Sequence, residues 1–375
     1  MDTGKKQTIY INGRFLTQPI SGVQRYAGEI IKALDVLIEK EVVDTSLYQI
    51  VILCPNKNIH EFPELQNIPI VRTGRLGGHA WEQLELPFFI KRNTLFCPGN
   101  TAPILTLLFG AKTIVTVHSL SYLYFAKAYS LFYRLWYRMM TPAILRLANA
   151  VITVSETEKK IISEHFPGAG SRLFAIQNGG LPVSCSAENS TGRKTDKEPY
   201  ILYVGALTRS KNFQGAMEAV RILNKTVKAK LVVAGSAGKA FNYASMVDHA
   251  QNEGLTEFKG QINNLEDLIE LYRGAACFVF PSFYEASPLP PIEAMACGCP
   301  VIVSDIPALR ERCGDAALYC NPGDPEDIAR KIEYLIKNPD TAARLIKRGK
   351  ERAKIFDWEN CALKTFEIIS APSPK

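Results

Sequence analysis

Short apolar runs rich in β-branched residues alternate with longer amphipathic segments along most of the chain. This alternation is typical of parallel βαβ units, because a buried parallel strand is apolar on both faces and its crossover helix is apolar on one. A first series of predicted strands occupies residues 8–13, 48–54, 93–99, 113–118 and 149–155. A second series occupies residues 199–207, 229–235, 277–282 and 300–305. The sequence therefore predicts an α/β protein with two doubly wound, Rossmann-like domains.

A polar segment without hydrophobic periodicity, residues 182–199, separates the two series and reads as a linker. We expect an N-terminal domain over residues 1–181, a C-terminal domain over 200–355, and a C-terminal helix and tail after the second sheet, over 356–375. Two domains of this kind are expected to face each other across a cleft, with ligands at the carboxyl ends of the strands.

Composition excludes several classes of protein. The 375 residues are 47% hydrophobic and 22% charged, which suits two globular domains and not a disordered or fibrous chain. The nine cysteines are scattered without a C-x-x-C pair, so neither a disulfide framework nor a zinc site is indicated. The N-terminus has no apolar signal-peptide core, and prolines interrupt the longest uncharged stretch, residues 93–111. These features predict a cytoplasmic protein without a transmembrane segment.

The net charge of +7 lies almost entirely in the first half, because residues 1–180 contribute +6 of it. Such an excess attracts anionic lipid, nucleic acid or phosphorylated substrates, although a slightly basic soluble enzyme has the same balance. Residues 121–150 mix aromatic and basic side chains, which favours either a membrane-surface segment or a core and subunit contact. No nucleic-acid-binding module is recognisable, so nucleic acid is not an expected partner.

A candidate anion site follows the first strand of the second series. That strand ends at Gly205, the next loop carries Arg209 and Lys211, and an amphipathic helix begins near Asn212. Free backbone N–H groups and the helix dipole both favour negative charge at such a point, which suggests phosphate. The alternative is a pair of surface charges with Asn212 as an ordinary helix cap.

Two carboxylates lie close together in the sequence after a later strand. Glu285 is in the loop after the strand at 277–282, and Glu293 is about one turn into the next helix. A carboxylate accepts hydrogen bonds from two vicinal hydroxyls, so the pair is suited to hold a sugar and a ribose beside the phosphate site. Two glutamates at this spacing are a weak signal when taken alone.

The longer string around them is specific. Residues 285–301, EASPLPPIEAMACGCPV, resemble the signature E-G-F-G-L-P-x-x-E-A-M-A-C-G-T-P-V of the family-four glycosyltransferases, which have the GT-B fold. The resemblance extends over nearly the whole chain, through SGVQRYAGEI, TIVTVHSLSYL, ITVSETEKKII, IQNGG, YVGALTRSKN and DPEDIARKI. It implies a glycosyltransferase whose two domains face each other across a cleft.

The resemblance also implies roles for individual residues. Lys211 corresponds to the lysine that neutralises the donor diphosphate, with Arg209 as its helper. Glu293 corresponds to the residue that binds the ribose, and Glu285 to the one that contacts the donor sugar. His118 resembles the histidine near the reacting carbon, although a lone histidine at a strand end is more often structural.

Four further positions are assigned to donor binding by the same resemblance. Gly22, in the first βα loop, matches the glycine that lets backbone approach the phosphates, and Ile262 is near the usual base contact. Gly205 ends the strand that precedes the phosphate loop. Leu289 keeps a backbone N–H for an anion contact.

The sequence departs from the family pattern at three places. Ala206 stands where many members have arginine, which raises the question whether Arg209 substitutes for it. Residues 286–288 are Ala-Ser-Pro where G-F-G is frequent, and Pro288 has no N–H to offer the donor. Ser119 follows the histidine where aspartate is common, which predicts a different sugar or acceptor preference.

No metal ion and no other cofactor is expected. The sequence has no D-x-D motif, and its five histidines have no ligand spacing. The growing charge on a leaving diphosphate is then stabilised by cations and a helix dipole, the role predicted for Arg209 and Lys211.

The resemblance implies retaining transfer of a hexose, mannose or similar, from a GDP- or UDP-sugar to a glycan or polyprenyl-linked acceptor. The implied setting is bacterial surface-polysaccharide synthesis (lipopolysaccharide O-antigen, capsule or exopolysaccharide), with peripheral contact to the cytoplasmic face of the inner membrane. A GT-B epimerase, a glycosyl phosphorylase and a non-catalytic nucleotide-sugar-binding protein remain alternatives. An NAD-dependent oxidoreductase is disfavoured, because Gly235 and Gly238 do not complete a G-x-G-x-x-G fingerprint.

Overall fold

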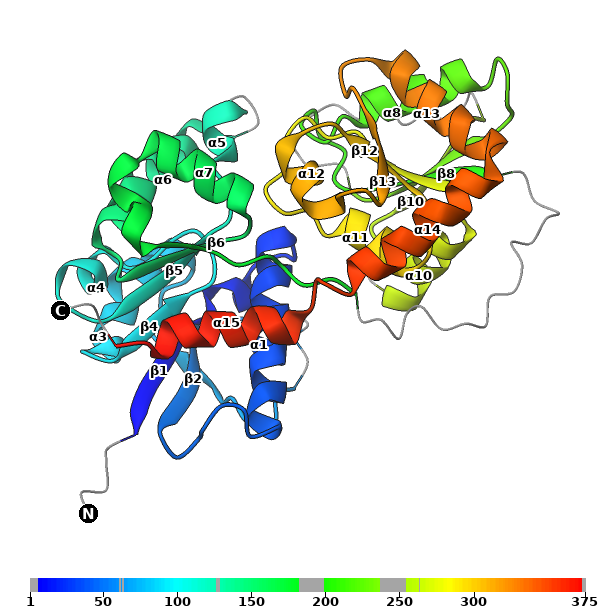
Figure 1. Cartoon of the computed structure of the whole chain (residues 1–375). Coiled ribbons are helices and arrows are strands. Elements are labelled where there is room, and N and C mark those ends of the chain that lie inside the picture. Colours follow the sequence, from blue (N-terminus) through cyan, green and yellow to red (C-terminus); the bar gives the residue numbers. More distant parts are fainter. Residues whose placement is uncertain are drawn as a thin grey trace. The chain divides into compact units, whose positions relative to one another are not determined.

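The structure, a computed structural model, describes residues 6–60, 62, 64–125, 129–181, 199–236, 254–262 and 264–372. It forms two compact units (Figure 1). The first unit is Met1–Gly179 together with Trp358–Lys375, and the second is Gly180–Asp357. Residues 182–198 of the predicted linker 182–199 lie outside the described residues.

The described part of the first unit is built on a seven-stranded parallel sheet with strand order β3-β2-β1-β4-β5-β6-β7. In the centre of this sheet, Ile9 pairs with Ile50 on one side and with Thr94 on the other. The strands are β1 (Gln7–Asn12), β2 (Tyr48–Pro55), β3 (Ile70–Thr73), β4 (Thr94–Cys97), β5 (Thr113–Val117), β6 (Ala150–Thr153) and β7 (Leu173–Ala175).

Helices connect these strands, and their apolar faces cover the sheet. The helices are η1 (Gly13–Thr17), α1 (Gly22–Glu39), α2 (Gly78–Leu84), α3 (Leu86–Ile90), α4 (Ile104–Leu108), α5 (Ser121–Tyr124), α6 (Leu131–Leu147), α7 (Glu156–His165), η3 (Pro167–Arg172) and α15 (Trp358–Ser370). In α1 the side chains of Ile30, Ile31 and Leu34 are fully buried, as the apolar positions of an amphipathic helix require.

The last helix, α15, returns to the first unit and packs along α1 (Figure 1). Lys40 at the end of α1 forms an ion pair with Glu359 at 2.6 Å, and the Tyr26 and Trp358 rings meet edge to face at 6.0 Å. The helix thus follows the second sheet in the sequence and belongs to the first unit in space.

The second unit has, in its described part, a six-stranded parallel sheet with strand order β10-β9-β8-β11-β12-β13. Its strands are β8 (Tyr200–Val204), β9 (Lys230–Ala234), β10 (Thr256–Gly260), β11 (Cys277–Phe280), β12 (Val301–Ser304) and β13 (Ala317–Cys320). Its described helices are α8 (Phe213–Leu223), α10 (Leu265–Gly274), α11 (Pro290–Ala296), α12 (Pro307–Cys313), α13 (Pro325–Lys337) and α14 (Pro339–Ala353).

These two sheets confirm the predicted pair of doubly wound α/β units. The nine predicted strands are present, and the structure adds β3, β7, β10 and β13. All four added strands lie at sheet edges. Because β3 and β10 are largely exposed, they lack the continuous apolar run that reveals a central strand.

Each sheet has one point at which the strand order reverses direction. It lies between β1 and β4 in the first unit and between β8 and β11 in the second. In doubly wound sheets, ligands bind at the carboxyl ends of the strands at this switch point. Functional groups are therefore expected at this point in both units.

Candidate active site

The loop after β8 carries the predicted phosphate-binding residues. Asn212 caps α8 from a left-handed backbone conformation (φ 53°), accepting a hydrogen bond from the Gly215 N–H and donating one to the Pro322 carbonyl. This cap fixes the point at which the helix begins, directly after Lys211. Arg209 is exposed, and no described group bonds to its guanidinium. Two cations therefore adjoin a helix N-terminus, as the sequence predicts.

Lys211 and Glu285 form an ion pair across the switch point of the second unit. The Lys211 ammonium lies 2.6 Å and 2.7 Å from the two carboxylate oxygens of Glu285. It also lies 5.5 Å above the centre of the Phe280 ring. A backbone hydrogen bond from Phe283 to Ser210, 2.9 Å long, joins the two loops. The structure thus brings together a cation and a carboxylate that are far apart in the sequence.

Glu293 lies in the first turn of α11 and is 1% exposed. The Tyr272 hydroxyl, from α10, donates a hydrogen bond of 3.2 Å to its Oε2 atom. Pro290 and Pro291 occupy the first helical positions, where the missing N–H groups cost nothing. A carboxylate held in this way can accept hydrogen bonds from a pair of hydroxyls.

The departure at Pro288 has a structural counterpart. The buried guanidinium of Arg312 donates a hydrogen bond of 3.1 Å from Nε to the Pro288 carbonyl and stacks on the Phe356 ring at 4.2 Å. Arg312 therefore holds the loop that leads into Leu289, the N-cap residue of α11, which is 8% exposed. The sequence gives no signal for this role of Arg312.

Glycines line the carboxyl ends of β8, β9 and β10. Gly205 donates its N–H to the Ala234 carbonyl, and Gly235 donates to the Gly260 carbonyl. A Cβ atom on Gly235 would lie 1.9 Å from the Gly205 oxygen, so only glycine allows this approach. Ile262, two residues after Gly260, is half-buried beside this edge. The predicted donor residues of the second unit thus surround one end of its sheet.

Gly22 and His118 belong to the first unit. Gly22 is the exposed first residue of α1, and a Cβ atom there would meet nothing within 4 Å. His118 follows β5, is 8% exposed, and donates a hydrogen bond of 2.8 Å from Nε2 to the Pro98 carbonyl. Burial lowers the pKa of His118 to about 4, although this hydrogen bond acts in the opposite direction. The imidazole is therefore neutral near pH 7, with Nδ1 as its acceptor atom.

A polar cluster at the switch point of the first unit is absent from the sequence predictions. The fully buried Glu82 carboxylate of α2 accepts hydrogen bonds from Asn12 at 2.6 Å, Thr101 at 2.8 Å and Arg14 at 3.3 Å. His79 lies 3.2 Å from its other oxygen. Although burial by itself raises the pKa of Glu82, the Arg14 guanidinium and the hydrogen bonds from His79 and Thr101 lower it to about 2. The only signal of this cluster in the sequence is one charged residue in each of two short stretches, Arg14 in GRF and Glu82 in WEQ.

The aromatic and basic segment over α6 divides into two faces. The half-buried Tyr133, Trp136 and Tyr137 pack against the core of the first unit. Leu131, Phe132, Leu135 and Met139 are each at least half exposed. The aromatic stripe of the sequence is thus largely core, and the exposed face of the helix is mainly aliphatic.

The described residues contain neither a cluster of metal-ligating side chains nor a helix suited to cross a membrane. No group of three or more His, Cys, Asp or Glu side chains in these parts of the chain is arranged to hold a metal ion. Among the described helices, none combines the length and the apolar character needed to span a bilayer.

Two family models match the chain, one to each half. Residues 20–179 match the model described as Glycosyltransferase Family 4, and residues 187–352 match Glycosyl transferases group 1. The chain belongs to the family-four glycosyltransferases. Family membership, predicted from EASPLPPIEAMACGCPV and the other motifs, is confirmed by these matches, and so is the prediction that the protein is an enzyme of the glycosyltransferase class.

Two curated relatives match most of the chain. An O-antigen chain mannosyltransferase B of Escherichia coli is 26% identical over 378 residues, covering 92% of this chain and 95% of the relative. The O-antigen chain mannosyltransferase RfbU of Salmonella typhimurium is 28% identical over 266 residues, covering 70% of this glycosyltransferase and 71% of the relative.

Solved structures show the same fold. WaaG, a glycosyltransferase involved in lipopolysaccharide biosynthesis, superposes with a TM-score of 0.74 at 13% identity, covering 97% of this chain and 100% of that one. HepE of Anabaena in complex with UDP-glucose gives a TM-score of 0.74 at 14% identity, covering 98% and 100%. These likenesses confirm the GT-B fold of the glycosyltransferase.

Proposed function

We propose that this glycosyltransferase is a retaining, metal-independent hexosyltransferase that acts in bacterial surface-polysaccharide synthesis. It moves mannose or a similar hexose from a GDP- or UDP-sugar to a glycan or polyprenyl-linked glycan acceptor, at the cytoplasmic face of the inner membrane. The O-antigen mannosyltransferases among its relatives support the pathway and the sugar, and the UDP-glucose complex of HepE supports a nucleotide-sugar donor.

The observation that carries the proposal is the arrangement at the switch point of the second unit. Lys211 and Glu285 meet there from the loops after β8 and β11, and Glu293 lies at the start of α11. An ammonium suits a diphosphate, whereas two carboxylates suit the hydroxyls of a hexose and a ribose. The three groups therefore correspond in chemistry to the three parts of a nucleotide sugar.

The proposed reaction needs no side-chain nucleophile. The bond between the anomeric carbon and the phosphate oxygen breaks, and its electron pair stays on that oxygen. An acceptor hydroxyl forms the new bond on the same face of the sugar, and its proton passes to the leaving phosphate oxygen. Lys211, with Arg209 in place of the arginine missing at Ala206, stabilises the negative charge that develops on the diphosphate.

The test is a binding and turnover screen of the purified protein in EDTA with GDP-mannose, UDP-glucose, UDP-galactose, GDP and UDP. We expect one nucleotide series to raise the melting temperature, and Lys211→Ala and Glu293→Gln to abolish that shift. Lys347→Ala, which removes an exposed lysine of α14, is the matched control. Binding that survives both site variants contradicts the assignment. Sugar interconversion without an acceptor favours the epimerase alternative.

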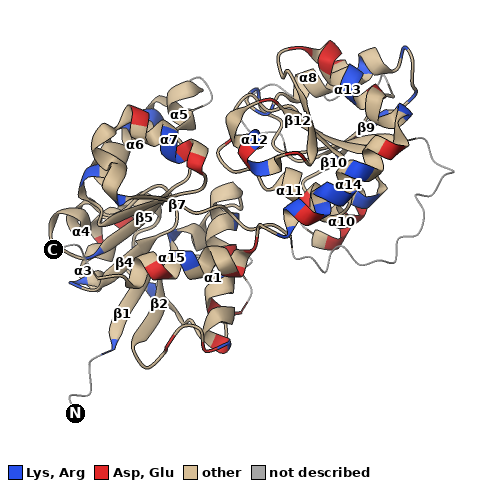
Figure 2. Ribbon diagram, viewed as in Figure 1, with Lys and Arg blue, Asp and Glu red and all other residues tan. Residues whose placement is uncertain are grey.

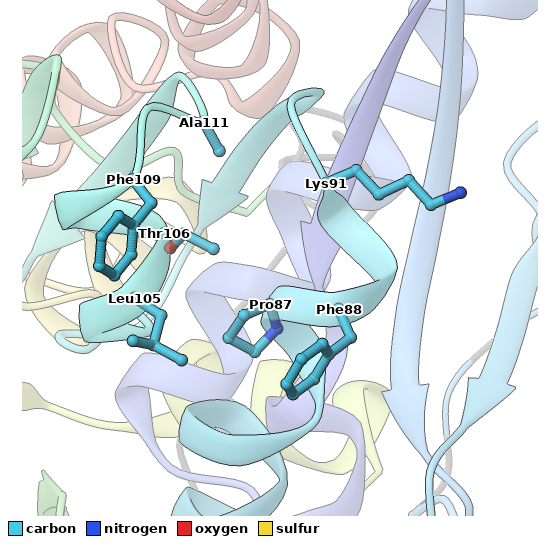
Figure 3. A pocket seen from close by; sticks show the side chains of 7 residues that line it. All are labelled: Pro87, Phe88, Lys91, Leu105, Thr106, Phe109 and Ala111. Carbon is cyan, nitrogen blue, oxygen red and sulfur yellow. The ribbon is translucent and has the colours of Figure 1, made fainter.

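Membrane contact is proposed through one face of the first unit. Of the 22 large apolar side chains that are exposed among the described residues, 12 lie between Leu84 and Leu147. They concentrate on α3, α4 and α6, which pack against one another in turn. Between α3 and α4 lies an apolar hollow of about 180 Å³, where Phe88 and Phe109 are each 74% exposed (Figure 3).

The same face is basic. From Leu86 to Ser155 the sequence has no Asp or Glu and seven Lys or Arg residues. Lys91, Arg92, Arg138 and Arg146 are exposed there, and none forms an ion pair within the described residues. Figure 2 colours the Lys and Arg positions of the ribbon blue and the Asp and Glu positions red. Exposed apolar groups among unpaired cations are the features by which a protein docks on an anionic bilayer.

Vesicle sedimentation tests this contact. We expect binding to phosphatidylcholine vesicles that contain phosphatidylglycerol, weaker binding in high salt, and little binding to phosphatidylcholine alone. The double variant Phe88→Ser with Phe109→Ser should weaken binding about tenfold, because two large apolar groups no longer leave water. Leu47→Ser, at another exposed apolar residue of the first unit, should have no effect. Equal binding by the double variant contradicts this surface.

A further inference from the structure

Lys211 and Glu285, the lysine and glutamate proposed to bind the donor, form an ion pair with each other. Both carboxylate oxygens of Glu285 lie within 2.7 Å of the Lys211 ammonium. No other described polar group bonds to either head group. The Glu285 side chain is 7% exposed and that of Lys211 is 29% exposed. Loss of the ion pair would therefore cost the carboxylate more free energy than the ammonium, because water reaches the ammonium more easily.

The pair is held by backbone that does not need to move. The Lys211 N–H donates to the Thr208 carbonyl, and the Tyr203 hydroxyl donates to the Lys211 carbonyl at 3.3 Å. The contact between Phe283 and Ser210 fixes the loop of Glu285 against the loop of Lys211. Breaking the pair therefore requires only a rotation of the flexible lysine side chain.

We propose that this ion pair makes the site favour the intact nucleotide sugar over the nucleoside diphosphate that remains after transfer. The inference rests on the proposed function. An intact donor replaces both partners at once, because its diphosphate takes the Lys211 ammonium while its sugar hydroxyls donate to the Glu285 carboxylate. The free diphosphate replaces only one of them and leaves a buried carboxylate without a partner.

This preference for the intact donor opposes the stronger attraction that Lys211 alone would have for the free diphosphate. The terminal phosphate of a free nucleoside diphosphate has a second pKa of about 6, so it carries more negative charge near pH 7 than the sugar ester does. A lysine without a competitor would hold this product more tightly than the donor. Glu285 competes for the same ammonium once the sugar has left, which favours release of the diphosphate.

Isothermal titration of the full chain with UDP, GDP, UDP-glucose and GDP-mannose tests the inference. In Glu285→Gln, the diphosphate of the nucleotide series that the wild type binds should bind about tenfold more tightly, equivalent to about 1.4 kcal/mol. The corresponding sugar nucleotide should bind more weakly. A merely structural role of Glu285 would weaken both ligands together, so the opposite signs are diagnostic.

The matched control is Glu333→Gln, which breaks the exposed Lys337–Glu333 pair of the same 2.6 Å length on α13 and should change neither constant. If the glutamine variant does not fold, Glu285→Ala gives the same test, because it also frees Lys211. Unchanged or weaker binding of the diphosphate by the variant overturns the inference and leaves the donor site standing. Failure of all four nucleotides to bind either protein overturns the donor site and the inference with it.

Discussion

At the scale of single residues, both units hold a carboxylate away from water at the switch point of the sheet. Glu82 in the first unit is bound by Asn12, Thr101, Arg14 and His79, whereas Glu285 in the second has only Lys211 within the described residues. A fully bonded buried charge is a fixed part of the structure, and a carboxylate with one mobile partner can exchange that partner for a ligand. The difference predicts a structural role for Glu82 and agrees with the binding role proposed for Glu285.

The lowered pKa of Glu82 predicts a dependence of stability on pH. The ordinary glutamate pKa is about 4.3, so the ionised carboxylate stabilises the folded state above that pH. This stabilisation should be lost as the pH falls from about 5 to about 2, the value in the folded protein. Glu82→Gln should lower the free energy of unfolding at pH 7 by about 3 kcal/mol, because a buried guanidinium loses its counter-charge.

Urea unfolding of the wild type and Glu82→Gln at several pH values between 7 and 3 measures this effect. The two curves of stability against pH should converge as the pH falls, since the wild type alone loses the ionised carboxylate. A constant difference in the free energy of unfolding across this pH range would show that Glu82 is not ionised in the folded protein.

At the scale of elements, the geometry of the proposed donor site depends on how closely the strand ends approach each other. The carboxyl ends of β8 and β9 meet through Gly205 and Gly235, and the latter has a φ of 152°, which side chains rarely adopt. The loops that carry Lys211 and Glu285 leave the sheet from β8 and β11, its neighbour. A change in how these strand ends pack would therefore displace both Lys211 and Glu285.

Gly235→Ala should destabilise the protein by about 2 to 4 kcal/mol, because its Cβ atom would lie 1.9 Å from a backbone oxygen. It should also weaken nucleotide binding, since β8 must shift to relieve the clash. The matched control is Gly254→Ala, where φ is also positive but no atom lies within 4 Å of the new Cβ. Thermal unfolding and nucleotide titration of both variants measure the two effects. Equal losses would refute the packing argument.

At the scale of the whole molecule, the boundary of the first unit does not coincide with any single stretch of sequence. Its core is completed by α15, where Ala362 and Ile369 are almost fully buried and Phe366 meets the Tyr48 ring at 5.3 Å. Lys112 donates a hydrogen bond of 2.6 Å to the Ile369 carbonyl at the end of this helix. The N-terminal residues alone therefore lack a part of their own core.

A fragment of residues 1–181 should consequently be less stable than the same fragment supplied with a peptide of residues 356–372. The peptide binds only the folded fragment, so it should raise the melting temperature in proportion to the logarithm of its concentration once it is in excess. Circular dichroism melts with the peptide and with its Phe366→Ser version make the comparison. No response to the native peptide would contradict the assignment of α15 to this unit.

The sequence by itself determined the class of the fold, the central strands and the family. These follow from short-range features, namely apolar runs of the right period and a long signature string, which are readable without spatial neighbours. It also predicted that Lys211, Glu285 and Glu293 belong to one ligand site, through the resemblance. Edge strands such as β3 escaped prediction because half-exposed strands carry little pattern.

Only the tertiary structure decided which groups touch. The pairing of Lys211 with Glu285, the hydrogen bond from Arg312 to Pro288 and the bonds from Asn12 and Arg14 to Glu82 each join residues at least 24 positions apart. Local propensities do not encode such distances, because they depend on the order of strands in the sheet and on the loops that leave it. For the same reason, the sequence placed α15 after the second sheet, and packing placed it on the first.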